Sequence, residues 1–217
     1  EFRRVLFRSA HCPIWHGWVE VREEKTPQLL PTRAIPPDGA VCGMIAAREL
    51  ARGPGVAPAN EALRGVVGLI SPVNDAQWDL LFNRQVNVLH ARPGKFLTMS
   101  AYTLSNDRQL LQISVRRMLI FLRKLVYREG MRYVFEPNNE RFRRSVQTRF
   151  ERMFDRLIQG GSLMAYSVDT GDSLNNFGEI DRGRFIIAIR VALTYPVEYI
   201  TIVLLRTSET LLDVLER

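Results

Sequence analysis

Residues 93–126, PGKFLTMSAYTLSNDRQLLQISVRRMLIFLRKLV, predict a turn, a strand and an amphipathic helix in succession. After the opening Pro-Gly turn, residues 96–102 are rich in side chains that favour strands. From Val115 onward the apolar side chains recur every three or four residues, which is the helical period. Ser114 is the expected N-cap of this helix, and Gly130 marks its expected end.

The rest of the chain alternates short strands with helices, which predicts the α/β or α+β class, with a mixed sheet flanked by helices. Further helices are expected at residues 41–50, 71–82 and 136–158. Strands are expected at residues 66–69, 86–89, 132–135, 163–169, 185–193 and 197–205. The leucines of residues 208–217 predict a short amphipathic helix at the end of the chain.

The composition indicates a globular protein with a basic surface. The chain has 217 residues, 46% of them hydrophobic and 24% charged, which is enough to bury a core. Its formal net charge is +7, and of its 30 basic residues only Lys25, Lys95 and Lys124 are lysine. A GC-rich coding sequence would explain this bias. Alternatively, arginine is used because its fork binds carboxylates on partner subunits.

Cysteine usage and targeting signals indicate where the protein assembles. Cys12 and Cys42 are too few for a disulfide framework, so we expect assembly in a reducing cytoplasm. No apolar run is long enough to span a bilayer, and no signal peptide is evident. Residues 1–9, EFRRVLFRS, resemble a translated sequencing adapter and are expected to be non-native. Residues 10–57 are expected to be a loop-rich remnant of an upstream region.

Several ordered motifs resemble contractile tail sheath proteins, which build phage tails, tailocins and extracellular contractile injection systems. PPDGAVCG at 36–43 and APANEALRGVVGL at 57–69 are similar to two family segments, at the family's spacing. Five further motifs follow in the family's order: YTLS at 102–105, SVRRM at 114–118, VFEPNN at 134–139, EIDRGR at 179–184 and PVEY at 196–199. One departure is that Met99-Ser100 stands where the family has tryptophan-glycine. The motif positions singled out as structural are Pro58, Asn60, Glu61, Gly65, Gly68, Arg116, Arg117, Glu136, Pro137, Asn138, Glu179, Asp181 and Gly183.

The resemblance implies a structural protein. Residues 58–206 would form the sheath C-terminal core domain, and residues 207–217 would form a C-terminal arm or short helix. Such subunits stack as hexameric rings around an inner tube and contract to drive the tube through a target envelope. The implied partners are further copies of the chain, the inner tail tube protein, and the baseplate and tail terminator proteins. The implied location is a virion tail or an extracellular injection particle that is assembled in the bacterial cytoplasm.

The expected helix at 136–158 carries an arginine face opposite its apolar stripe. Its members are Arg141, Arg144, Arg149, Arg152 and Arg156. They form either a solvated surface or an ionic face against another subunit or the inner tube. A basic nucleic-acid-binding module is the alternative function. Such a module predicts aromatic stacking platforms, whereas the aromatic residues here lie on the apolar stripe, so no nucleic-acid partner is expected.

The sequence contains no recognisable catalytic or cofactor motif. Neither a Ser-His-Asp nor a Cys-His constellation emerges, and Gly65 and Gly68 lack the Lys-Ser/Thr ending of a phosphate-binding loop. His11, Cys12 and His16 lack the second half of a zinc site. The carboxylates of Asp169, Asp172, Glu179 and Asp181 lack the order of a calcium loop. We therefore expect no enzyme, metal or cofactor, although a deep polar pocket with perturbed titratable groups would favour an unrecognised enzyme.

Overall fold

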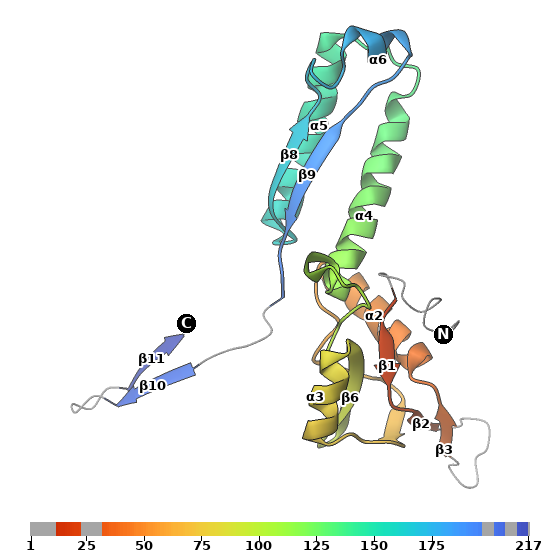
Figure 1. Ribbon diagram of the computed structural model, residues 1–217, viewed down its shortest axis with the longest axis vertical. Coiled ribbons are helices and arrows are strands. Elements are labelled where there is room, and N and C mark those ends of the chain that lie inside the picture. The colour runs from red at the N-terminus through yellow and green to blue at the C-terminus, as the bar shows by residue number, and fades with distance from the viewer. Residues whose placement is uncertain (1–11, 23–31, 197–201, 207–211, 217) are drawn as a thin grey trace.

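The computed structural model describes residues 12–22, 32–196, 202–206 and 212–216. Two units are stacked along the longest axis (Figure 1). The sheet unit comprises the described residues up to 112, and the helical unit comprises residues 113–196. Each unit has its own hydrophobic cluster. The expected mixture of helices and sheets is confirmed.

A four-stranded sheet forms one part of the sheet unit, with strand order β1-β6-β7-β4. The strands are β1 (Ile14–His16), β6 (Val86–Arg92), β7 (Lys95–Thr98) and β4 (Glu61–Ala62). β1 runs parallel to β6, whereas β7 is antiparallel to both of its neighbours. Arg92 pairs with Lys95, so Pro93 and Gly94 form a two-residue turn in which Gly94 has a φ of 74°.

A second sheet of the sheet unit has strand order β3-β2-β5 and packs with helix α2. Its strands are β3 (Thr32–Ile35), β2 (Val19–Arg22) and β5 (Val66–Leu69), and α2 spans Asp38–Arg52. Val41 and Met44 of α2 join the cluster of Val19, Leu63 and Leu89. The lead-in region thus contains β3 and a longer helix than the predicted residues 41–50, because apolar burial orders it.

Helix α3 (Asp75–Asn83) lies beside β6 at the end of the sheet unit remote from the helical unit (Figure 1). Asn74 caps the helix: its side chain accepts a hydrogen bond from the backbone N–H of Gln77 at 2.8 Å. The Gln77 side chain accepts in return from the Asn74 N–H at 3.2 Å. This capping box starts the helix four residues later than the predicted Ser71.

The helical unit contains the long helix predicted from the opening stretch. Helix α4 spans Ile113–Gly130 and so begins just before the expected Val115, and α5 spans Glu140–Gln159 with Asn139 as its N-cap. An antiparallel pair, β8 (Leu163–Asp169) and β9 (Ala188–Leu193), packs with α5. The short helix α6 (Phe177–Asp181) lies in the connection between these strands. Met118 and Leu122 of α4 join Phe150 and Phe154 of α5 in the core.

The predicted strand at residues 132–135 is wrong. The chain passes from α4 into a 3-10 helix, η2 (Met131–Tyr133), and Phe135 is exposed with a φ of 73°. The short apolar run lies at the reversal between two helices, and no strand of the described segments pairs with it. A strand needs a hydrogen-bonded neighbour, so local side-chain preference alone did not produce one.

Of the arm and the short helix that the sequence left open for the end of the chain, the helix is wrong for residues 212–216. Residues Leu212–Glu216 form strand β11, which pairs antiparallel with β10 (Ile202–Arg206). The pairing of five residues on each strand outweighs a weak local helical pattern. This hairpin projects from the side of the molecule (Figure 1). Parts of the predicted strand and tail, at 197–201, 207–211 and 217, lie outside the described residues, as do residues 1–9.

Within the described part of the chain, no helix is long and apolar enough to cross a membrane.

Candidate subunit-interface site

A basic cleft of about 580 Å³ lies between the C-terminal half of α4 and the middle of α5. Its rim carries Arg128, Arg132, Arg149, Arg152 and Arg156. Its apolar surface comes from Leu125, Met153 and Leu157. Among the described residues, Glu129 is the one carboxylate that lines it. Five positive charges against one negative charge give the cleft a strong preference for anionic groups.

Glu129 ties the two helices together inside this cleft. Its carboxylate accepts hydrogen bonds from Nε of Arg149 at 2.5 Å and from the hydroxyl of Tyr133 at 3.3 Å, and it pairs with Arg132 at 3.1 Å. Burial alone would raise the pKa of Glu129, but the hydrogen bond from Arg149 and the charge of Arg132 outweigh it and lower that pKa. In return, the hydrogen bond to Glu129 raises the pKa of Arg149.

The remaining cleft arginines can bind a partner. Among the described residues, no carboxylate forms an ion pair with Arg128, Arg152 or Arg156. Their guanidinium groups line an open surface. An accessible guanidinium group without an ion-pair partner can bind a carboxylate through two parallel hydrogen bonds.

The structure divides the predicted arginine face. Arg149, Arg152 and Arg156 meet at the cleft, whereas Arg141 is exposed elsewhere on α5 and Arg144 pairs with Glu140 at 2.5 Å. The prediction missed Arg128 on α4 and Arg132 on the following η2, which reach the same cleft. Their spacing of four residues was a possible signal, but only the packing of this segment against α5 joins them to the α5 arginines.

The first sheath-like motif stabilises the sheet unit. The buried Pro58 accepts a hydrogen bond through its carbonyl oxygen from Thr98 Oγ1 at 3.1 Å. Asn60 has a φ of 56° and donates its backbone N–H to the carbonyl of Thr98 at 2.6 Å. Glu61 pairs with Arg48 of α2. The motif therefore fixes the edge of the first sheet against α2.

Two positions of that motif favour glycine, each for a different reason. Gly65 has a φ of 77°, in the left-handed region that glycine tolerates best. At Gly68 an added Cβ would lie 2.5 Å from a carboxylate oxygen of Glu20 on the paired strand, so a side chain there would displace Glu20.

The arginine pair at the start of α4 faces the sheet unit. Arg117 pairs with Glu49 of α2. The Nε atom of Arg116 is buried and, among the described residues, has no hydrogen-bond partner. The Arg117 ion pair links the first turns of α4 to the sheet unit, so the two units are joined by more than the chain itself.

The later motifs hold together the far end of the helical unit. The Asn138 side chain donates a hydrogen bond to the carbonyl of Arg184 at 3.1 Å, which connects the start of α5 to the end of the α6 region. Pro137 accepts from the N–H of Asn139, and Glu136 is exposed. Glu179 pairs with Arg182 and with Arg184, near the exposed Asp181 and near Gly183, whose φ is 67°.

Arg143 was absent from the predicted arginine face, yet it has a structural role. It is buried on α5 and pairs with Asp172 at 2.7 Å. Arginine is rarely buried without such a partner. Its position next to Phe142 on the apolar side of the helix could have indicated this.

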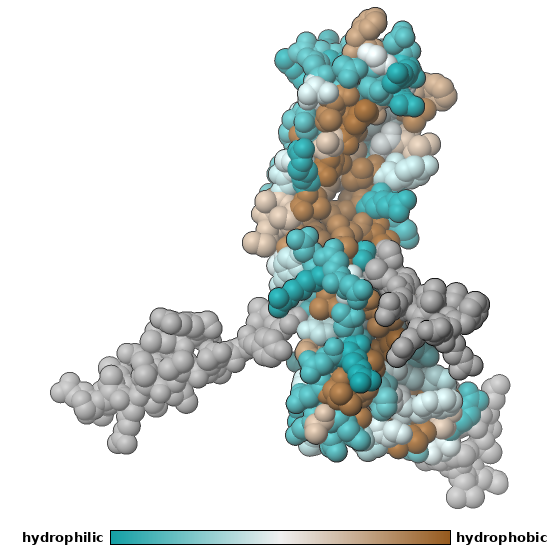
Figure 2. All heavy atoms as spheres, in the orientation of Figure 1, coloured by the Kyte–Doolittle hydropathy of each residue, from teal (hydrophilic) through white to brown (hydrophobic). Residues whose placement is uncertain are grey.

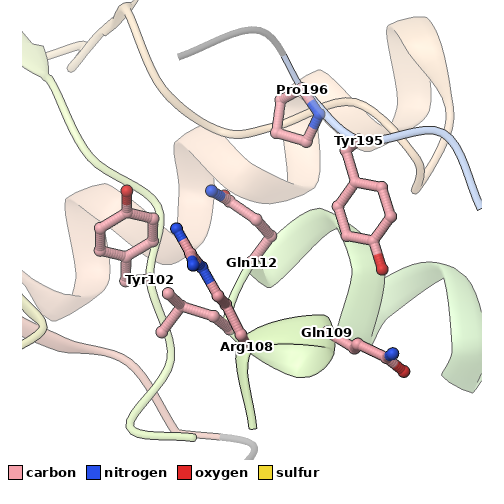
Figure 3. Close-up of a pocket in the computed structure, with 7 residues that line it drawn as sticks. Tyr102, Arg108, Gln109, Gln112, Tyr195 and Pro196 are labelled. Atoms are coloured by element: carbon pink, nitrogen blue, oxygen red, sulfur yellow. The ribbon is translucent and has the colours of Figure 1, made fainter. Parts of the chain in front are cut away.

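A second cleft, of about 490 Å³, lies where the two units meet (Figure 3). The cleft is lined by Tyr102, Gln112, Tyr195 and Pro196. Arg108 adds a charged side chain to this lining. Its side chains include no paired acid and base and no nucleophile with an adjacent base. No cluster of three metal-ligating side chains occurs among the described residues.

Comparison with known proteins assigns the fold. Residues 105–204 match the phage tail sheath C-terminal domain family. Structures of the anti-feeding prophage baseplate and of its contracted helical sheath are each 26% identical, with a TM-score of 0.79, over 94% and 93% of this chain. The contracted PVC sheath complex of an extracellular contractile injection system is 25% identical over 93% of the chain, with the same TM-score of 0.79.

The chain spans 56% of each anti-feeding prophage protein and 57% of the PVC protein. A search of curated proteins finds no match. The resemblance to the C-terminal portion of contractile tail sheath proteins that the sequence motifs indicate is confirmed.

Proposed function

We propose that this chain, whose residues 105–204 match the phage tail sheath C-terminal domain, is a structural subunit of a contractile sheath. The observation that carries the proposal is the similarity of 93% of the chain to two sheath structures in the contracted state, at TM-scores of 0.79. Residues 58–206 serve as the sheath core domain in this proposal. Residues 207–217 are the arm that extends toward a neighbouring subunit.

The subunits stack as hexameric rings around an inner tube. Sheath contraction is a change between two packings of the same subunit, in which the extended packing is metastable and the contracted packing is lower in free energy. A signal from the baseplate lowers the barrier, and the re-packing drives the tube through the target envelope. The work comes from interfaces between subunits, so the protein needs complementary surfaces rather than a catalytic centre.

The partners follow from this role. Copies of the chain form the lattice, the inner tube protein fills it, and baseplate and tail terminator proteins bind its two ends. The arginine face of α5 supplies an ionic contact to a neighbouring subunit or to the tube. The particle is a phage tail or an extracellular injection particle that is assembled in the bacterial cytoplasm.

Electron microscopy tests the proposal. The full-length product of the gene is expressed together with its neighbouring genes, and lysates are examined by negative staining. Striated tubes, with rings of six subunits in cross-section, are the expected result. A monodisperse monomer under every condition would overturn the assignment.

The same preparation separates the alternative function. A basic nucleic-acid-binding module binds DNA at physiological ionic strength, with an affinity that falls steeply as salt increases. A sheath subunit is expected to show no such association in a filter-binding titration. Salt-dependent DNA binding by a protein that forms no tubes would favour the alternative.

A further inference from the structure

We propose that the basic cleft between α4 and α5 binds the exposed face of helix α3 of a second copy of this chain. The proposal rests on the proposed sheath function and names one of its subunit contacts. It assigns both sides of that contact to described residues: Arg128, Arg152 and Arg156 on one copy, and Asp75, Asp79 and Leu80 on the other.

The cleft requires an occupant that is acidic and partly apolar. Three of its rim arginines, Arg128, Arg152 and Arg156, form no ion pair among the described residues. Its floor contains Leu125, Met153 and Leu157. A purely polar ligand would leave this apolar floor in contact with water, and a purely apolar one would leave the guanidinium groups unpaired. A helix that carries carboxylates beside an aliphatic side chain satisfies both surfaces at once.

Helix α3 has the complementary face. Five exposed residues lie on one side of the helix by their spacing: Asp75, Ala76, Asp79, Leu80 and Asn83. Leu80 is 55% exposed, so the face carries an aliphatic side chain beside two carboxylates. Among the described residues, neither Asp75 nor Asp79 forms an ion pair.

No other described helix offers such a face. α2, α4 and α5 all contain basic residues, whereas α3 contains none. The five-residue α6 is also acidic and carries the exposed Phe177 and Asp181, but its Glu179 already pairs with Arg182 and Arg184, and it spans little more than one turn. Among the described helices of more than two turns, α3 is therefore the acidic one whose charges are left for a partner.

The spacing of the charges also agrees. Asp75 and Asp79 are four residues apart, and so are Arg152 and Arg156 on α5. Each interval corresponds to about 6 Å along a helix axis. Two carboxylates on one turn can thus meet two guanidinium groups on one turn, while Leu80 enters the space between the rim arginines.

The two surfaces lie at different ends of the molecule. α3 is at the far end of the sheet unit, and the cleft lies in the helical unit (Figure 1). Hydrophobic residues run along the helical unit between hydrophilic margins (Figure 2). A contact between unlike surfaces is heterologous, so a pair of copies keeps one free α3 on one copy and one free cleft on the other. Such contacts generate rings or helical arrays rather than closed dimers.

Charge reversal tests this contact in the full-length protein. Asp79→Arg places a positive charge opposite the cleft, and the double variant Arg152→Glu/Arg156→Glu reverses two rim charges. Each is expected to raise the protein concentration needed for half-maximal assembly at least tenfold, since attractive contacts become repulsive ones. Combining both sets in one chain is expected to restore assembly to within a few-fold of the parent. Arg123→Glu/Lys124→Glu, on an exposed part of α4 outside the cleft, is the matched control.

A cross-linking experiment reads the contact without requiring tubes. Cys12 and Cys42 are exposed and are first replaced by serine. Leu80→Cys and Met153→Cys are then made in separate chains, mixed, and treated with a short bismaleimide. A cross-linked dimer is expected from the mixture but not from either chain alone, and Asp79→Arg in the Leu80→Cys chain should abolish it.

The two experiments separate this contact from the sheath function. Tubes that form normally in the Asp79→Arg variant and in the Arg152→Glu/Arg156→Glu variant, each tested alone, without a cross-link in the mixture, would overturn the contact and leave the sheath function standing. A cross-link that depends on Asp79 would support the contact even in a preparation without tubes, and the sheath function would then be the part that failed.

Discussion

The carboxylate of Glu129 near the end of α4 accepts a hydrogen bond at 2.5 Å from Nε of Arg149, in the middle of α5. The side chain of Glu129 is only 15% exposed, whereas that of Arg149 is 58% exposed, so the bond is protected from solvent on the side of Glu129. It holds together the two walls of the basic cleft, and it makes the spacing of the cleft arginines dependent on one carboxylate.

Replacing Glu129 by glutamine should destabilise the protein by about 1–2 kcal/mol, because a charge-assisted hydrogen bond at a protected position is lost. Thermal unfolding monitored by circular dichroism measures the change. Glu136→Gln, at an exposed position, is the matched control and should leave the melting temperature unchanged. Equal effects of the two substitutions would contradict the role assigned to Glu129.

The same carboxylate predicts a pH dependence. The pKa of Glu129 is lower in the folded state than its ordinary value of 4.5, so the folded state binds its proton less readily than the unfolded state. The stabilisation is present above about pH 4.5 and is lost as the pH falls through the lowered pKa. Urea titrations between about pH 3 and pH 6 should therefore show a smaller difference between the parent and Glu129→Gln at the acid end.

Phe150→Ala should destabilise the protein more than the loss of the Glu129 carboxylate does. The ring is fully buried in the core of the helical unit, and its removal leaves a cavity that costs about 3–5 kcal/mol. Chemical denaturation measures this loss. Phe177→Ala removes the same ring from a site that is 83% exposed and should cost less than about 1 kcal/mol. A similar midpoint for the two variants would show that the core is not where the structure places it.

Asn87→Ala should destabilise the sheet unit by about 2–3 kcal/mol, because it leaves buried backbone groups without partners. Asn87 is fully buried; its Oδ1 accepts from the N–H of Tyr102 at 2.7 Å, and its Nδ2 donates to the carbonyl of Tyr102, also at 2.7 Å. Hydrogen exchange of the Tyr102 amide reports the loss directly. Asn83→Ala, at an exposed position, should leave that amide protected.

Phe135→Gly should stabilise the protein by about 0.5–1 kcal/mol, contrary to the usual effect of glycine. Phe135 is exposed and adopts a φ of 73°, a conformation that is strained for a bulky residue and relaxed for glycine. Differential scanning calorimetry can resolve the rise in melting temperature. Phe177→Gly, inside α6, should lower it instead, and a decrease for both variants would refute the strain argument.

The sequence predicted elements whose signals are local. The start of α4 was placed to within one turn, because apolar spacing acts over single turns. Its last residue is the expected Gly130, although this glycine keeps a helical φ of −59° and the chain continues into η2. Strand β8 was predicted with its observed bounds, since it alternates and follows two glycines. Asn139 also caps α5, as its place before the helical pattern suggests.

The sequence-based predictions failed where contacts with a distant segment of the chain determine the secondary structure. Residues 132–135 have strand-like side chains but no strand beside them, and residues 212–216 have a helical pattern but pair with β10. The candidate site shows the same limit. Arg149, Arg152 and Arg156 were predicted as one face, but the α4 half of the cleft depends on how two helices pack, which no local pattern records.

Helix α4 acts as a lever. Its first turns are held against the sheet unit by Arg117 and Glu49, and its remaining length lies in the helical unit. With 18 residues it is about 27 Å long, and as one unbroken helix it resists bending. A rotation of about 10° at its start therefore displaces its far end, and the cleft beside it, by about 5 Å. A small change of angle where the two units meet is thus amplified into a movement comparable to one helical turn.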